Sequence, residues 1–174
     1  MTQVLLFLIN TLFLLYIVAV MLRFLLQWVK ADFYNPFCQF LMKLTNPLLL
    51  PLRKLIPGWF GLDLAAVALM WVLQIVEIAL IEWIVSVPIS AVIVISALMQ
   101  LIMLLLNLYF YLLLVRAVLS WVSPYQGSPM QILLIQLTEP LLKPVRSIVK
   151  PVHGFDLSPL ALMILIQVVL ILIR

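Results

Sequence analysis

The chain has few of the residues that build soluble surfaces, metal sites and catalytic sites. Only 9% of its 174 residues are charged, against about 25% in a typical soluble domain. The single cysteine, Cys38, excludes an intrachain disulfide and a cysteine-rich metal site. The single histidine, His153, argues against a histidine-based site within one chain, and the four glycines form no phosphate-binding loop. No nucleophile–base pair stands out, so we expect no enzyme activity, no metal and no cofactor.

Hydrophobic residues dominate what remains. They make up 67% of the chain, and the mean hydropathy is +1.32. Such a chain cannot cover a globule with polar surface, and we predict an all-α integral membrane protein. The first apolar run lacks a basic n-region and an A-x-A-like cleavage site, so we expect it to be a retained span and not a signal peptide. The four predicted transmembrane helices cover residues 4–22, 64–87, 91–115 and 157–173.

The basic residues gather in the two long segments between the spans. Nine of the ten lie in or at these segments, and Arg174 is the exception. The positive-inside rule therefore predicts that both long loops are cytoplasmic and both termini outside. Basic residues divided between two loops form no recognisable nucleic-acid footprint, so we expect no direct nucleic-acid partner. The nine residues are Arg23, Lys30, Lys43, Arg53, Lys54, Arg116, Lys143, Arg146 and Lys150.

The chain also repeats itself. A shift of 93 residues, the separation of Arg23 and Arg116, aligns the two halves without a gap. We predict two tandem, parallel helix-hairpin repeats, since two spans per copy preserve the orientation. Repeat 1 covers residues 1–87 with its amphipathic loop at 30–62, and repeat 2 covers 88–174 with its loop at 123–156. Matched structural residues are Arg23 and Arg116, Trp28 and Trp121, Pro36 and Pro129, Pro47 and Pro140, Pro51 and Pro144, Arg53 and Arg146, and Asp63 and Asp156.

These repeated motifs resemble those of the YggT family, which is called YlmG in other bacteria and has plastid relatives. The residues that carry the resemblance are LRFLLQWV, YNPF, LTNPLLLPLRKLIP and GLDLAAVAL in the first copy. In the second copy they are VRAVLSWVSP, SPM, LTEPLLKPVRSIV and GFDLSPLALM. The first copy departs from the usual D-x-S-P ending, because Ala65-Ala66 stands where the second copy has Ser158-Pro159.

The resemblance implies a multi-pass protein of the bacterial inner (plasma) membrane. It also implies links to division-gene neighbourhoods in some bacteria, to cytochrome maturation and nucleoid partitioning in plastids, and to osmotic tolerance.

Each long loop contains a proline-studded, basic and partly apolar stretch. Asn35-Pro36 and Ser128-Pro129 pair a good N-cap with a proline suited to the first helical position, so each should begin a helix. Pro47 and Pro140 are expected to end that helix or to begin a second short one. The stretch should lie in the headgroup plane as an interfacial amphipathic helix, or alternatively dip into the membrane. Its proposed lipid- or partner-binding residues are Arg53, Lys54, Lys143 and Arg146.

Several polar residues near the spans allow more than one interpretation. Asp63 and Asp156 could cap the helices that follow them, pair with Arg53 and Arg146 ten residues upstream, or do both. Arg23 and Arg116 are interpreted as span ends whose side chains snorkel to the interface.

Charged and amide side chains also fall inside the second predicted span. Gln74, Glu77 and Glu82 lie there, and a charged residue at a span centre costs roughly 2.5–3.5 kcal/mol on insertion scales. Gln100 and Asn107 on the third predicted span could hydrogen-bond to Gln74 and Glu77. Glu77 either joins helices through such hydrogen bonds or is an ion or proton site. Leu170 stands at its position in the second copy.

Two functions fit this pattern. The first is a non-enzymatic assembly or scaffold factor of the envelope, of division or of membrane complexes, acting through the two amphipathic loops. Its partners would be anionic membrane lipids and other membrane proteins or a second copy of itself. The alternative is an oligomeric ion channel or an osmotic-stress transport protein that uses Glu77.

Overall fold

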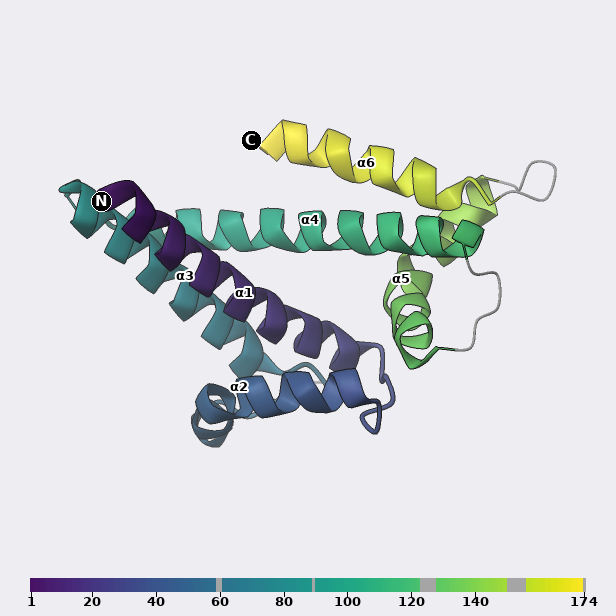
Figure 1. Ribbon diagram of the computed structural model, residues 1–174, viewed down its shortest axis with the longest axis horizontal. Helices are drawn as coiled ribbons and strands as arrows, with labels where there is room; N and C mark the ends of the chain where they lie inside the picture. Colours follow the sequence, from purple (N-terminus) through teal and green to yellow (C-terminus); the bar gives the residue numbers. More distant parts are fainter. Residues whose placement is uncertain (59–60, 89, 123–127, 150–155, 174) are drawn as a thin grey trace. The chain divides into compact units, whose positions relative to one another are not determined.

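The computed structural model describes residues 1–58, 61–88, 90–122, 128–149 and 156–173, and its regular structure is α-helical (Figure 1). This confirms the all-helical class. The helices within these ranges are α1 (Thr2–Trp28), α2 (Pro36–Leu55), α3 (Leu64–Val85), α4 (Ile93–Val122), α5 (Pro129–Ile148) and α6 (Ser158–Ile173).

Three of the described helices are long and apolar enough to cross a membrane. They are α1 with 27 residues, α3 with 22 residues and the Ile93–Ser120 part of α4 with 28 residues. At 1.5 Å per residue each exceeds a hydrocarbon core of about 30 Å. The apolar helix α6 has 16 residues, which corresponds to about 24 Å. A fourth span at α6 therefore stays a prediction.

The long helices do not end at their arginines. We expected Arg23 and Arg116 to close the first and third spans, yet α1 continues to Trp28 and α4 to Val122. The helices continue because no helix-breaking residue follows either arginine within them, and the points at which the spans leave the membrane stay a prediction. Both arginines consequently project from the side of a helix, where another element can pack on them.

The chain forms two compact units, residues 1–104 and 105–174. In the first unit, α1 packs on α3 and α2, and α2 also packs on α3. The contact uses the second half of α1, where Ile17, Val20 and Leu25 are buried, and the fully buried Ala65 and Ala66 at the start of α3. Small residues at a helix crossing let the two backbones approach closely. In the second unit, α5 packs on α6, whose first residues Ser158 and Pro159 are buried at the matching positions.

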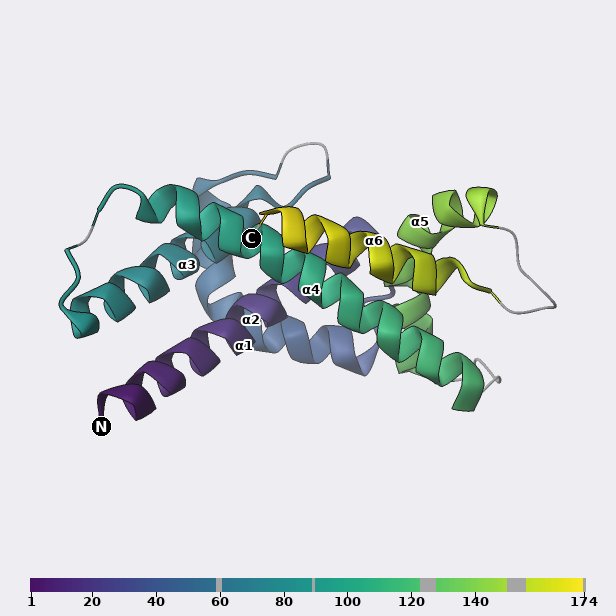
Figure 2. The same cartoon turned by 90° about the horizontal axis from the view of Figure 1, so that it is seen from above.

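Helices α2 and α5 run through their prolines. Pro47 and Pro51 lie inside α2, and Pro140 and Pro144 lie inside α5, so the prediction that Pro47 and Pro140 end or restart a helix was wrong. All four prolines are on the exposed side of their helix. A missing N–H there bends the helix with its convex side outward. The axis of α2 accordingly turns toward its C-terminal end (Figure 1, Figure 2).

The predicted starts of α2 and α5 are confirmed. The side chain of Asn35 accepts a hydrogen bond from the backbone N–H of Phe37, with Pro36 at the first helical position. Ser128 forms a reciprocal capping box with Gln131, and Pro129 follows it. Because these caps satisfy N–H groups that a helix start leaves unpaired, both helices begin at fixed positions.

Candidate functional site

The same hydrogen bond joins an arginine to a threonine in each unit. In the first unit, Nη1 of Arg23 on α1 donates to Oγ1 of Thr45 on α2, at 2.5 Å. In the second, Nη1 of Arg116 on α4 donates to Oγ1 of Thr138 on α5, at 2.6 Å. Each threonine hydroxyl also donates to the carbonyl oxygen four residues earlier, at 2.7 Å in both helices. Both threonines are fully buried, so each proline-containing helix is fixed at one register on a long apolar helix.

The arginines of this Arg–Thr clamp do not snorkel into water. Arg23 retains only 5% of its exposure, and the side chain of Arg116 retains 15%. The prediction of snorkelling span ends was wrong, because α2 and α5 present a hydroxyl acceptor to each guanidinium. A buried charge is tolerated only where hydrogen bonds compensate its lost hydration.

A second arginine in each unit pairs with the aspartate ten residues downstream. Arg53 forms an ion pair with Asp63, and its Nε donates to Oδ2 of Asp63 at 3.1 Å. In the second unit Nε of Arg146 donates to Oδ2 of Asp156 at 2.8 Å.

The aspartates also satisfy the first turns of α3 and α6. Oδ1 of Asp63 accepts from the backbone N–H of Ala66 and makes Asp63 the N-cap of α3. Oδ1 of Asp156 accepts from the backbone N–H of Ser158, the first residue of α6, at 3.0 Å. Both roles foreseen for Asp63, capping and pairing, therefore occur together, and Asp156 likewise pairs with Arg146 while it accepts from the start of its helix.

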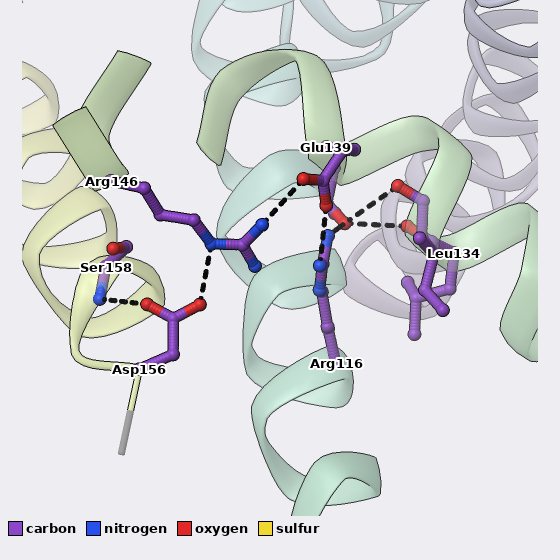
Figure 3. Close-up of polar contacts among 8 residues, drawn as sticks. Arg116, Leu134, Glu139, Arg146, Asp156 and Ser158 are labelled. Carbon is purple, nitrogen blue, oxygen red and sulfur yellow. Dashed lines mark hydrogen bonds and ion pairs between the residues drawn. The ribbon is translucent and has the colours of Figure 1, made fainter. Parts of the chain in front are cut away.

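A glutamate extends this arrangement in the second unit. Oε2 of Glu139 accepts from Nη2 of Arg116 at 2.7 Å, and Oε1 accepts from Nη1 of Arg146 at 2.6 Å. Figure 3 shows Glu139 between the two arginines and Arg146 between Glu139 and Asp156. Two guanidinium groups thus alternate with two carboxylates and leave no net charge in this four-residue cluster.

The two carboxylates of this cluster are held in their ionised form. Burial alone would raise the pKa of Glu139, but hydrogen bonds and charge from Arg116 and Arg146 outweigh it and lower the pKa. For Asp156, hydrogen bonds from Ser158 and the pairing with Arg146 likewise outweigh burial and lower the pKa. Both groups therefore stabilise the folded chain in their charged state.

The first unit differs at two positions. Arg53 donates from Nη2 to the side-chain oxygen of Gln27 on α1, at 3.0 Å, where Ser120 stands in the second half. Asn46 stands where the second half has Glu139.

The proposed basic surface residues fall into two kinds. Arg53 and Arg146 are committed to ion pairs within the chain and are about one-third exposed. Lys54 and Lys143 are exposed, and neither takes part in an ion pair with another described residue.

Glu77 is buried, and its side chain belongs to a short hydrogen-bonded series with Gln74 and Gln100. Nε2 of Gln74 donates to Oε2 of Glu77 at 2.9 Å and to Oε1 of Gln100 on α4 at 3.0 Å. The predicted bond from Gln100 is therefore found at Gln74 and not at Glu77, and whether Glu77 joins helices or forms an ion or proton site stays a prediction. In the described part of the chain no group of three potential metal ligands surrounds Glu77, and one side-chain oxygen of Glu82 is buried without a hydrogen-bond partner there.

The remaining sequence candidates are placed as follows. Cys38 is buried on α2. This burial, together with the charge of Asp32, raises the pKa of its thiol. Trp28 is exposed at the end of α1. The backbone of Trp121 belongs to α4, but its side chain is outside the described part, as are His153 and Lys150.

Reasoning from the sequence missed the acceptors that organise the site. Thr45, Thr138, Gln27 and Glu139 were not proposed as partners of any arginine. A signal did exist for the threonines, since Arg and Thr are separated by 22 residues in both halves. Separation alone does not identify a contact when the helices involved cross at an unknown angle.

Comparisons with known proteins agree with one another. The family model described as CCB3/YggT matches residues 2–84 and 95–174. The "Uncharacterized protein in proC 3'region" of Vibrio alginolyticus is 46% identical over 165 residues, which cover 92% of this chain and 88% of the relative. The "Uncharacterized protein YggT" of Escherichia coli strain K12 is 40% identical over 165 residues, covering 94% and 85%. The "Uncharacterized protein PA0392" of Pseudomonas aeruginosa is 38% identical over 157 residues, covering 88% and 80%. No solved structure gave a significant match.

The Arg53–Asp63 pair predicts a charge-swap rescue. Arg53→Glu should lower the amount of protein in the membrane fraction, because it places a carboxylate against the buried carboxylate of Asp63. Adding Asp63→Arg should restore part of the loss by re-forming the pair, but not all, since an arginine cannot cap α3 and a lost cap costs about 1 kcal/mol. Lys54→Glu, a reversal at the exposed neighbour, is the control and should have little effect. A double variant no better than Arg53→Glu alone would refute the pairing.

The lowered pKa of Glu139 predicts a pH-dependent loss of stability. A carboxyl group with a folded-state pKa below its ordinary value of about 4.3 stabilises the fold above that value and loses this effect as the pH falls through the lowered pKa. Glu139→Gln should reduce the unfolding free energy in detergent by about 1 kcal/mol at pH 7, allowing for the group's partial exposure. The gap to wild type should narrow as the pH falls below the ordinary carboxyl pKa of about 4.3. Lys143→Gln on the same helix should leave the pH dependence unchanged, and a gap independent of pH would contradict the assignment.

Proposed function

The chain belongs to the CCB3/YggT family, and on the basis of its geometry we propose that it is a non-enzymatic, multi-pass protein of the bacterial inner membrane that assembles or scaffolds a membrane complex. Its working surface would be the two proline-containing helices, α2 and α5. The observation that carries this proposal is the repeated Arg–Thr clamp, which fixes each of these helices to a long apolar helix. A merely connecting loop needs no such repeated, buried anchor.

Helix α2 divides its circumference into three stripes that follow the helical period. One stripe is buried against the other helices, one is apolar and exposed, and one is polar. The buried stripe consists of Cys38, Leu41, Thr45 and Leu49. The exposed apolar stripe consists of Phe40, Leu44, Leu48 and Leu55. The polar stripe includes Gln39, Lys43, Asn46 and Lys54, with the exposed Leu50 among them.

This division suits a helix lying at a membrane surface. The exposed apolar stripe of α2 would enter the acyl boundary, and the lysines would meet anionic headgroups and water. A polar edge held beside the membrane in this way gives a protein partner a surface of fixed orientation. Helix α5 would offer a second, different surface, since its exposed charge comes from Lys143 and its leucines at 133, 134, 137 and 142 are buried.

The arrangement in the membrane is part of the proposal. Four spans, with α6 as the fourth, would make two tandem repeats that both place their long loop on the cytoplasmic side. The two segments matched by the family model, residues 2–84 and 95–174, support such a duplication.

Site-specific photo-crosslinking tests the scaffold role. A photoreactive amino acid at Lys54, on the polar edge of α2, should give one defined protein adduct in living cells. At Leu48, on the exposed apolar stripe, it should give lipid adducts. Leu12, which is 67% exposed on α1, is the control outside α2. A Lys54 product that contains only this protein, or that matches the Leu12 pattern, would overturn the scaffold proposal.

Thiol labelling tests the proposed orientation. With Cys38 replaced by alanine, a single cysteine at Lys54 should be shielded from a membrane-impermeant maleimide in spheroplasts and react after lysis. A single cysteine at the exposed Val87 between α3 and α4 should react in intact spheroplasts. The reverse pattern would place the α2 surface outside the cell and exclude a cytoplasmic partner.

A further inference from the structure

The two units use corresponding arginines differently, and the difference leaves donors unused in the first unit. In the second unit, Nη2 of Arg116 and Nη1 of Arg146 both donate to Glu139. The corresponding atoms of the first unit are Nη2 of Arg23 and Nη1 of Arg53. Neither makes a hydrogen bond to another described residue, although Nη1 of Arg23 makes the same threonine bond as its counterpart.

The missing acceptor is explained by a single residue. Asn46 occupies the helical position of Glu139: each directly follows the clamping threonine and precedes the second arginine by seven residues. Residues seven apart lie on the same side of a helix, two turns from one another. The side chain of Asn46 forms no hydrogen bond with Arg23 or Arg53. An asparagine has no negative charge to place between two guanidinium groups.

The first unit is therefore left with one excess positive charge. Arg23 interacts electrostatically with both Arg53 and Asp63, but Asp63 is the only carboxylate among the described residues that pairs with either arginine. In the second unit two carboxylates neutralise two arginines. Arg23 is only 5% exposed, and a buried guanidinium with unused donors beside another cation is costly without an anion.

The position can be reached from outside. Arg53 is 34% exposed, and the Glu139 carboxylate at the corresponding place in the second unit is 27% exposed. Asn46 also lines an open pocket of about 420 Å³, together with Phe33, Tyr34, Gln39, Met42 and Lys43. Lys43 lines the same pocket as Asn46 and adds a further positive charge there.

We propose that the first unit binds a phosphate group, as free phosphate or on a phospholipid headgroup, with its oxygens where the Glu139 carboxylate lies in the second unit. Two oxygens on one phosphorus can accept from Nη2 of Arg23 and Nη1 of Arg53 as the two carboxylate oxygens do from their counterparts. Guanidinium groups favour this paired recognition of carboxylate and phosphate. The evidence for this site is the difference in hydrogen bonding between the two units, and it does not depend on the scaffold role.

The test measures thermal unfolding of the detergent-purified full chain. The probes are sodium phosphate against sodium chloride at equal ionic strength, and phosphatidylglycerol against diacylglycerol, which carries no phosphate, in mixed micelles. In one of the phosphate-bearing arms the unfolding temperature of wild type should rise by about 2–6 °C and level off as the ligand concentration increases. A response to free phosphate identifies an inorganic anion site, and a response to phosphatidylglycerol alone identifies a headgroup site.

Two variants at the matched position make the test specific. Asn46→Glu supplies the missing carboxylate, so it should unfold at a higher temperature without phosphate and lose the response. Glu139→Asn opens the same position in the second unit and should increase the response, which keeps the proposal testable even if Asn46→Glu does not fold. Absence of a wild-type response in both arms, a full response in Asn46→Glu, or an unchanged response in Glu139→Asn would each overturn the proposal.

Discussion

The buried hydrogen bond between an arginine on a long apolar helix and a threonine on a proline-bent helix organises both units. In an apolar chain, a guanidinium inside the protein must find acceptors or remain costly, and the threonine hydroxyl supplies one at 2.5 Å and 2.6 Å in the two units. The same hydroxyl donates to its own helix. Because the bond fixes the register of α2 and α5, it also places the downstream Arg53 and Arg146 near the starts of α3 and α6.

The second arginine of each unit links the proline-containing helix to the start of the next apolar helix. Asp63 and Asp156 each connect an arginine to the first turn of an apolar helix, so one carboxylate serves as a helix-start acceptor and as a counter-ion. This double use suits a membrane protein, where polar groups are few and each unsatisfied one is expensive. The charge of the two units then differs through one residue: Glu139 neutralises its pair of arginines, whereas Asn46 leaves its pair with an excess charge.

Several of these polar contacts could be predicted from local sequence rules. The caps at Asn35 and Ser128 and the pairing of Arg53 with Asp63 depend on short separations and known side-chain chemistry, and they were found as expected. The rules failed at Pro47 and Pro140, because a proline on the convex side bends a helix without ending it. They failed at Arg23 too, since its burial depends on where α2 packs and not on its distance from the end of an apolar run.

The sequence by itself determined the membrane class, the helical content and the duplicated motifs, because composition, apolar run length and a constant offset of 93 residues are properties of the linear chain. Only the tertiary structure decided which polar groups meet. The pairing of Arg23 with Thr45, of Arg53 with Gln27 and of Glu139 with two arginines joins residues on different helices or two turns apart on one helix. Such contacts depend on crossing angles and register, which arise from packing the helices together, so the difference between Asn46 and Glu139 acquires a physical meaning only in the folded chain.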